Sequence, residues 1–335
     1  IADKVDIIDD AHIDFLLIKN SGLLDMLIQF SDTIRNFLKC IKSDEHISWM
    51  KYHQQSNYVS INYLLKDMGK VIGMNCFGSS NIGAFCSATI SIDNNFEYFK
   101  TSLGLDRLSY NRDFSEHIFQ APFFLEEQVS FYSYKSDLHI NSDDYIFNIS
   151  EQIFELASFF NKKMLVLCTS YKQASQLKHR LFSKFKNINK QLLVHEKGRS
   201  RNSLIRAFKE SKNSVLIGTM AFWEGVDFPG DELSILMMIR IPFSNPNDPY
   251  LKYLDNQLNI QGKNGFNEYQ VPEACIKMKQ GFGRLIRTEL DSGIFIITDP
   301  RIFSSSYGRT IINSFPLEST LYTDISKILT DNKIL

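Results

Sequence analysis

Short apolar runs alternate with amphipathic stretches through the second half of the chain, and this alternation limits the possible folds more than any other feature. The apolar runs cover residues 164–168, 191–194, 215–217, 235–240 and 294–297, and helical periodicity covers 145–160, 172–185 and 203–208. Apolar runs of this length between helices are typical of strands that are buried on both faces. The pattern predicts an α/β fold in which a parallel sheet is flanked by helices.

Two arginines lie three residues apart in residues 280–287, Q-G-F-G-R-L-I-R, just before the last apolar run. On a continuous helix Arg284 and Arg287 would leave the same face about one turn apart. Guanidinium groups bind phosphate oxygens bidentately, so this pair suits a polyphosphate. Gly281 and Gly283 each cost roughly 1 kcal/mol in a helix, so we expect a close contact that requires them. The alternative is a pair of surface arginines on an amphipathic helix.

A second unusual stretch, residues 218–230, reads G-T-M-A-F-W-E-G-V-D-F-P-G. Together with residues 280–287 it resembles motifs V and VI of superfamily-two helicases. More narrowly, the two stretches resemble the DinG branch, which is related to XPD, and so do I-P-F-S-N-P-N-D-P-Y at 241–250 and D-P-R at 299–301. The resemblance runs from about Trp49 to the end of the chain.

Helicases of this kind bind ATP between two RecA-like lobes, and the resemblance implies three parts in this chain. Residues 1–45 carry helical periodicity, with a break expected near 20–22, and are predicted to be a remnant of the helical arch. Residues 46–140 are predicted to hold the end of the first lobe and a linker, beginning with strand-like alternation at 47–52 and 57–63. Residues 141–335 are predicted to form the second RecA-like lobe.

The resemblance also implies roles at the nucleotide. Arg287 is implied as an arginine finger that offsets charge on the transferring phosphoryl group, with Arg284 beside it and Gln280 sensing the γ-phosphate. A Ser-Ala-Thr that resembles motif III follows a short buried strand predicted at 81–86, at the strand end where open α/β sheets bind ligands. The residues implied to lie near the nucleotide, or to couple it to nucleic acid, are Glu224, Gly225, Asp227, Ser87 and Thr89.

A second group of residues is implied to bind single-stranded DNA: Thr169, Ser170, Tyr171, Gly218, Thr219 and Trp223. Hydroxyl and backbone N–H groups at 169–171 would hold a phosphate, although a simple helix N-cap explains the same residues. Trp223 and Phe222 would stack on bases, and the alternative for both is core packing. His195 is expected at the surface, where it would touch phosphate.

Charge along the chain points to a local groove. The whole chain has 37 basic and 38 acidic residues, which argues against a general attraction to nucleic acid. Residues 171–212, in contrast, hold twelve Lys or Arg against only Glu196 and Glu210. The alternative reading of this stretch is a solvated helix face.

The sequence Asp9-Asp10-Ala11-His12 invites comparison with the D-E-A-H box, whose carboxylates would hold Mg²⁺ and orient the attacking water. Helical periodicity continues through it, however, and only 77 residues separate Asp10 from Ser87. We therefore expect arch helix here. No G-x-x-x-x-G-K-[ST] is present, so ATP and Mg²⁺ would be bound only in a full-length protein that includes the missing N-terminal lobe.

The five cysteines contain no C-x-x-C pair, which predicts reduced thiols, no metal site and no iron–sulfur ligands in this chain. No signal peptide or membrane span is evident, and the chain begins with isoleucine, so we expect a fragment of a longer cytoplasmic protein. The predicted function is the C-terminal portion of a DinG-like ATP-dependent DNA helicase. The alternative is a non-unwinding, ATP-responsive DNA-binding part of a DinG-family exonuclease, and a pure binding module would leave Arg284 and Arg287 without a purpose.

Overall fold

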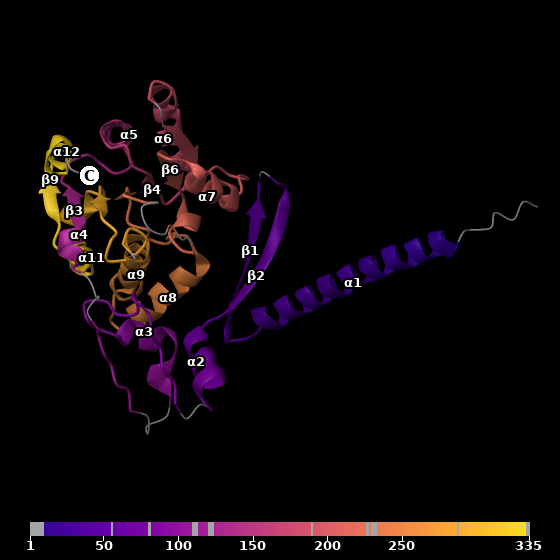
Figure 1. Ribbon diagram of the computed structural model, residues 1–335. Coiled ribbons are helices and arrows are strands. Elements are labelled where there is room, and N and C mark those ends of the chain that lie inside the picture. Colours follow the sequence, from indigo (N-terminus) through magenta and orange to yellow (C-terminus); the bar gives the residue numbers. More distant parts are fainter. Residues whose placement is uncertain are drawn as a thin grey trace, which may run out of the picture.

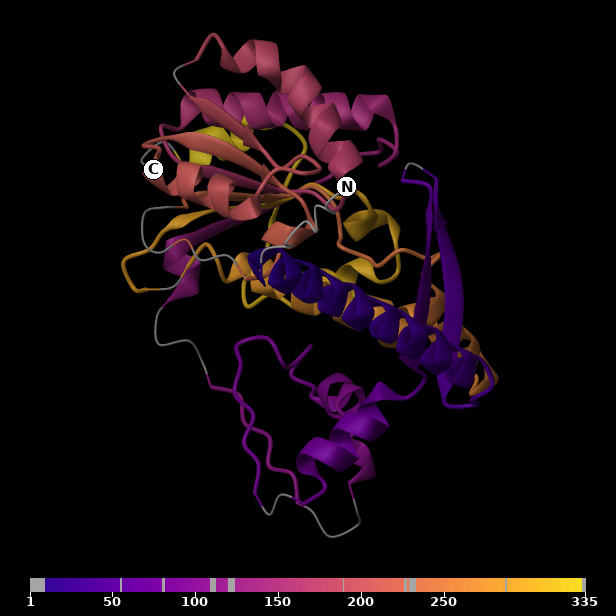
Figure 2. The same cartoon turned by 90° about the vertical axis from the view of Figure 1, so that its right-hand side faces the viewer.

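A computed structural model describes residues 10–54, 56–79, 82–108, 113–119, 124–188, 190–225, 228, 233–286 and 288–332, without the side chains of residues 10–21 (Figure 1). Its largest part is a seven-stranded parallel sheet with helices on both faces (Figure 2). The strand order is β5-β6-β4-β7-β8-β3-β9. The α/β fold that the sequence predicts is therefore confirmed.

The five strands that the sequence predicts in this sheet are present. They are β4 (Met164–Leu167), β5 (Gln191–Val194), β6 (Ser214–Gly218), β7 (Ile235–Met238) and β8 (Gly293–Ile297). In β4, Leu165 and Leu167 face one core, whereas Met164 and Val166 face the other. Burial on both faces explains why these strands are continuous apolar runs.

The helices divide between these two cores. One face of the sheet packs against α5 (Asp143–Phe159), α6 (Tyr171–Phe185) and α12 (Ser326–Asp331). The other face packs against α7 (Arg201–Glu210), α9 (Val271–Phe282), α10 (Arg301–Ser304) and α11 (Gly308–Asn313). Ser142, Ser170 and Ser200 cap the first turns of α5, α6 and α7 through their side chains, which fixes where these helices begin.

Two further strands complete the sheet and were not predicted. They are β3 (Val129–Tyr134), which lies between β8 and β9, and β9 (Thr320–Tyr322) at the edge. A short helix, α4 (Leu125–Gln128), leads into β3. The boundary expected between residues 140 and 141 is therefore wrong in position, because the sheet already includes Val129.

The N-terminal part consists of a long helix and a hairpin. Helix α1 (Asp10–Ile41) projects away from the sheet, and β1 (His46–His53) pairs antiparallel with β2 (Tyr58–Leu65) (Figure 1). The two strand-like stretches are thus confirmed, whereas the break near 20–22 is wrong, because α1 continues through Gly22. Asp10 begins this helix and does not end a strand, as expected for arch helix, and Asp9 lies outside the described residues.

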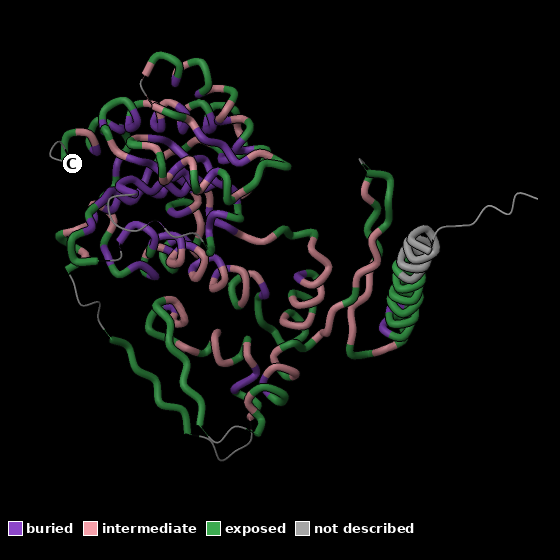
Figure 3. Tube along the Cα trace, turned by 45° about the vertical axis from the view of Figure 1, so that its right-hand side comes forward, coloured by how far each residue is buried: buried purple, intermediate pink, exposed green. Residues whose placement is uncertain are grey.

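Between the hairpin and the sheet lie short helical elements. They are α2 (Met68–Ile72), the π-helix η1 (Gly73–Phe77), α3 (Glu97–Ser102) and the 3₁₀ turn η2 (Leu105–Arg107). The buried strand predicted at 81–86 is wrong. Residues 82–86 form no ladder and are exposed (Figure 3), since no strand of the described chain lies beside them, and Asn81 is outside the described residues.

Candidate functional site

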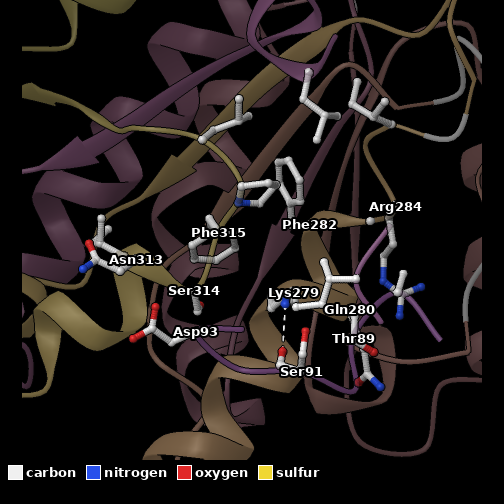
Figure 4. A pocket seen from close by; sticks show the side chains of 18 of the residues that line it. Thr89, Ser91, Asp93, Lys279, Gln280, Phe282, Arg284, Asn313, Ser314 and Phe315 are labelled. Atoms are coloured by element: carbon white, nitrogen blue, oxygen red, sulfur yellow. Dashed lines mark hydrogen bonds between the residues drawn. The ribbon is translucent and has the colours of Figure 1, made fainter. Parts of the chain in front are cut away.

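A cleft of about 1390 Å³ lies beside α9, and segments far apart in the sequence line it. Figure 4 shows Thr89, Gln280 and Arg284 at one end and Asp93, Asn313 and Ser314 at the other. The cleft brings together five of the residues predicted at the nucleotide: Thr89, Glu224, Gly225, Gln280 and Arg284. Ser87 does not line the cleft, but its Oγ lies 3.4 Å from the hydroxyl oxygen of Thr89. Asp227 and Arg287 lie outside the described residues.

The local backbone at Arg284 differs from the expected continuous helix. Helix α9 ends at Phe282 with Gly283 as its C-cap, so Arg284 does not project from a helix face. Its side chain is only 4% exposed, and Nη2 donates to the carbonyl of Trp223. Arg284 therefore ties the end of α9 to the loop at 219–225 while it lines the cleft.

The two glycines of this motif have different roles. A Cβ at Gly281 would lie 2.6 Å from Cε of Met238 in β7, so the expected close contact is confirmed there. A Cβ at Gly283 would meet nothing nearer than the Lys279 carbonyl at 3.6 Å. Gly283 thus makes no close approach and serves as the helix end.

Gln280 lies in the last turn of α9 and faces the cleft. Its Oε1 is buried and accepts no hydrogen bond from the described residues. Buried polar atoms in proteins are almost always hydrogen-bonded, so this amide is well placed to meet a polar group of a ligand. The amide can present either its oxygen or its nitrogen to that group by a flip.

Two basic residues were not predicted as site residues: Lys279 lines the cleft, and Arg201 binds residues that line it. Lys279 donates from Nζ to the carbonyl of Ser91 at 3.0 Å, and burial lowers the pKa of its ammonium. Arg201 donates from Nη2 to the carbonyl of Glu224 at 2.9 Å and also to that of Gly225. Both bind backbone oxygens, which no side-chain motif reveals.

A second cavity, of about 660 Å³, lies where β4, β6 and β7 end. Thr169, Ser170 and Met220 line it, together with residues between 242 and 251, which form a loop and the start of the next helix. The Ser170 hydroxyl accepts from the backbone N–H of Gln173 at 3.3 Å, so the N-cap reading of this serine is confirmed. Tyr171 is 46% exposed and stands at the first turn of α6.

The loop that lines the second cavity is held by the D-P-R segment. The carboxylate of Asp299 is fully buried and accepts from the backbone N–H of Ile241 at 2.8 Å. Arg301 pairs with the same carboxylate at 2.6 Å, and its guanidinium lies 5.3 Å from the ring centre of Phe243. This ion pair, in which Asp299 is fully buried and Arg301 is partly exposed, connects the end of β8 to the start of the loop. The other end of the loop is fixed by Asp248, which caps helix α8 (Pro249–Ile260).

The aromatic side chains expected to stack on bases lie in the core. Trp223 and Phe222 are both 0% exposed, and the Trp223 indole donates from Nε1 to the Cys168 carbonyl at 2.9 Å. Phe222 belongs to the turn η3 (Met220–Phe222) and packs directly on Gly218, where a Cβ would lie 2.6 Å from Cβ of Phe222. The predicted stacking by Trp223 is therefore wrong in this conformation, and core packing explains both rings.

His195 is also buried, contrary to the expected surface position. It is 4% exposed, and its Nδ1 lies 2.6 Å from the hydroxyl oxygen of Thr219. Burial, and then the charge of Arg201, lower the pKa of His195. The contact between the buried imidazole and the Thr219 hydroxyl therefore helps to fix the orientation of the Thr219 side chain.

Several cations of the basic stretch already have partners. Lys178 pairs with Glu196 at 2.7 Å, Lys184 pairs with Glu151 at 2.6 Å, and Lys190 donates to the carbonyl of Lys162 at 3.1 Å. The two ion pairs of Lys178 and Lys184 offset two of the positive charges that the sequence count gives.

The described residues hold neither a helix suited to a membrane nor a cluster suited to a metal ion. None of the described helices combines the length and apolar character that a bilayer crossing requires. No group of three or more His, Cys, Asp or Glu suited to a metal ion occurs in the described part of the chain.

Comparison with known proteins agrees with this arrangement. The sequence profile of the helicase C-terminal domain matches residues 153–318. The chain is 31% identical over 284 residues to the 3'-5' exonuclease DinG of Bacillus subtilis (strain 168), which covers 82% of the chain and 30% of that protein. It is also 31% identical over 245 residues to the ATP-dependent DNA helicase YoaA of Haemophilus influenzae, covering 73% of the chain and 37% of that protein.

The chain therefore spans about a third of the length of these curated relatives. Among solved structures, "XPD_APO" matches with a TM-score of 0.58 and 15% identity, covering 96% of this chain and 64% of that chain. At this level of identity the match shows the fold, which is the RecA-like architecture that the sequence predicts.

Proposed function

Residues 153–318 belong to the helicase C-terminal domain family in its DinG-like branch, and from this premise we propose that the chain is the C-terminal part of an ATP-dependent DNA helicase. In this proposal the cleft beside α9 takes the nucleotide, and the cavity at the strand ends takes single-stranded DNA. ATP and Mg²⁺ would be held mainly by a phosphate loop and carboxylates that lie outside this sequence.

The observation that carries the proposal is the path of residues 219–225. Met220, near the start of this loop, lines the cavity at the strand ends, whereas Glu224 and Gly225, at its end, line the cleft. Trp223, between them, is anchored in the core. A change at either cavity would therefore be passed to the other through one short loop, which is what coupling of ATP hydrolysis to DNA binding requires.

Two arginines hold this loop through its backbone. Arg284 binds the Trp223 carbonyl, and Arg201 binds the carbonyls of Glu224 and Gly225. Since Arg284 is occupied in this way, we propose that Arg287 is the arginine finger and that Arg284 positions the loop. A finger stabilises charge on the equatorial oxygens of the transferring phosphoryl group.

The DNA assignment rests on hydroxyl groups at the strand ends. Thr169 and Ser170 follow β4 and line the cavity, and the ring of Tyr171 is exposed at the first turn of α6. Thr219, after β6, is buried and does not line the cavity. The first turn of α6 also presents backbone N–H groups, which favour a phosphate. We propose that one backbone phosphate of the strand binds at this helix start and that Tyr171 stacks on a neighbouring base.

The proposal is tested by ATP hydrolysis in the full-length protein with and without a single-stranded oligonucleotide. Arg201→Met removes one anchor of the loop and is expected to reduce stimulation by DNA about tenfold, while hydrolysis without DNA changes less. Arg206→Met is the matched control, because Arg206 lies exposed on the same helix and pairs only locally with Glu210. An unmodified protein that hydrolyses no ATP under either condition would contradict the proposal.

A second function is favoured by one observation, the name of the Bacillus subtilis relative, 3'-5' exonuclease DinG. In that case the two cavities would respond to ATP and DNA and regulate a nuclease without strand separation. A labelled partial duplex distinguishes the two. ATP-dependent release of an intact strand supports the motor, whereas shortening of the strand without release supports the nuclease.

A further inference from the structure

One hydrogen bond crosses the cleft between α9 and the segment that follows Thr89. The Nζ atom of Lys279 donates to the carbonyl of Ser91 at 3.0 Å (Figure 4). Lys279 immediately precedes Gln280, and Ser91 lies two residues after Thr89, so the bond joins the neighbours of two residues that line the same end of the cleft.

The segment that receives this bond is a tight turn. Ile92 and Asn95 exchange backbone hydrogen bonds of 2.9 Å each way, and the two residues between them have left-handed backbones, Asp93 at φ 49° and Asn94 at φ 58°. Asparagine and aspartate tolerate this conformation better than most residues. These two hydrogen bonds and the left-handed backbones give the turn a defined shape.

Two contacts of different kinds hold this turn against the body of the protein. The Ile92 side chain is buried in the same core as α9, and the Ser91 carbonyl binds Lys279. The apolar contact of Ile92 keeps the turn packed against the core but does not fix its orientation, because the hydrophobic effect is not directional. A hydrogen bond from a charged donor is directional and is strong where water is excluded, so it can fix the orientation of the turn. Burial lowers the pKa of Lys279, which agrees with an ammonium that is partly removed from water.

We propose that Lys279 is a positioning residue that holds the turn at Ser91 and thereby sets the separation between Thr89 and the Gln280–Arg284 pair. The inference rests on the proposed function, in which this cleft takes the nucleotide. Lys279 donates to a backbone carbonyl and acts on the ligand only through the wall that it holds in place.

We call the hydrogen bond between Lys279 and the Ser91 carbonyl the tether. Hydrogen exchange in the full-length protein tests the tether without any need for ATP hydrolysis. Lys279→Met keeps the apolar stem and removes the ammonium, so amides in the peptide covering residues 88–95 should exchange about tenfold faster. Lys279→Arg retains a charged donor and should stay close to the wild-type rate. Lys252→Met, at an exposed position of α8, is the matched control and should change nothing in this peptide.

Three results would overturn the tether. They are wild-type exchange in Lys279→Met, equal acceleration in Lys279→Met and Lys279→Arg, and acceleration that extends equally to β7 and β8. The last result would mean that the ammonium supports the whole fold.

Steady-state kinetics then separate the tether from the proposed function. If the cleft takes ATP, Lys279→Met should raise KM for ATP about tenfold and lower kcat less, because the wall shapes binding and touches no reacting atom. Arginine at this position should restore KM. A looser turn with unchanged KM and kcat would show that the tether exists but that the nucleotide binds elsewhere, which would refute the function assigned to the cleft.

Discussion

The imidazole Nδ1 of His195 lies 2.6 Å from the hydroxyl oxygen of Thr219, just beyond the ends of β5 and β6. The rings of Tyr171 and Phe222 are close by, with centres 5.1 Å and 5.0 Å from that of the imidazole. Thr219 is itself only 3% exposed, so both residues of this pair are buried behind the surface where we propose that DNA binds.

This pair predicts a pH dependence of stability. Burial and Arg201 lower the pKa of His195 below 6.5, so the unfolded chain takes up this proton at a higher pH than the folded chain. Folding stability from this group is complete above about pH 6.5 and is lost as pH falls toward the folded pKa. Urea unfolding at about pH 7.5 and about pH 5.5 should show a smaller pH dependence in His195→Gln than in the wild type. The exposed His179→Gln is the control, and equal dependence in all three would contradict the assignment.

Binding of single-stranded DNA by this chain should be weak and strongly dependent on salt, because it neutralises several phosphates. Tyr171→Ala should weaken binding by about 1 kcal/mol or more if the ring stacks on a base. Phe182→Ala is the matched control, since Phe182 is an exposed ring nearer the other end of α6. Fluorescence anisotropy with a labelled oligonucleotide measures both effects, and a signal that does not change with salt would argue against this groove.

Arg287→Ala in the full-length protein should abolish most ATP hydrolysis while ATP and DNA binding are largely kept. An arginine finger acts in the transition state, so kcat should fall more than KM rises, by about 10³-fold. Arg287→Lys should restore little, because an ammonium lacks the planar fork. Wild-type hydrolysis in both variants would show that Arg287 is not the finger.

Arg284→Ala should behave differently, because this side chain is buried and binds the Trp223 carbonyl. We expect a loss of about 1.5–3 kcal/mol in unfolding free energy together with reduced hydrolysis. Thermal unfolding of the Arg284 and Arg287 variants side by side measures the difference. An Arg284 variant with wild-type stability and no hydrolysis would reverse the two roles.

Gly218→Ala should destabilise the protein by about 1–3 kcal/mol, because the added methyl would overlap Phe222 and disturb a packed core. Gly283→Ala is the matched control, since an added Cβ there meets only an ordinary contact at 3.6 Å. Urea unfolding compares the two. If Gly218→Ala leaves the unfolding free energy unchanged, η3 can move away from the added methyl without loss of stability.

Strands β4, β6, β7 and β8 could be predicted because each is a continuous apolar run that is buried on both faces of the sheet. Strand β3, V-S-F-Y-S-Y, mixes serines with aromatic residues, and only its pairing with β8 and β9 identifies it. The opposite error occurred at 82–86, where an apolar run has no neighbouring strand and stays exposed. Strand pairing depends on segments that are distant in the sequence. The local pattern therefore missed one real strand and predicted another that does not form.

The candidate site divides in the same way. Polar residues of the motifs, such as Thr89, Glu224 and Gln280, do meet in one cleft. Lys279 and Arg201 were missed because their partners are backbone carbonyls. The exposure of Trp223 and His195 was wrong because burial depends on how η3 packs beneath the surface, which residue type does not determine.

The place of β3 between β8 and β9 has a consequence for how the protein is made. On the ribosome β3 emerges before both strands that flank it, because about 160 or more residues separate β3 from β8 and β9 in the sequence. Until then its backbone N–H and C=O groups and its aromatic side chains have no partner. We expect late, slow closure of the sheet, since pairing between distant segments slows folding, and an intermediate with an open edge that is prone to aggregate.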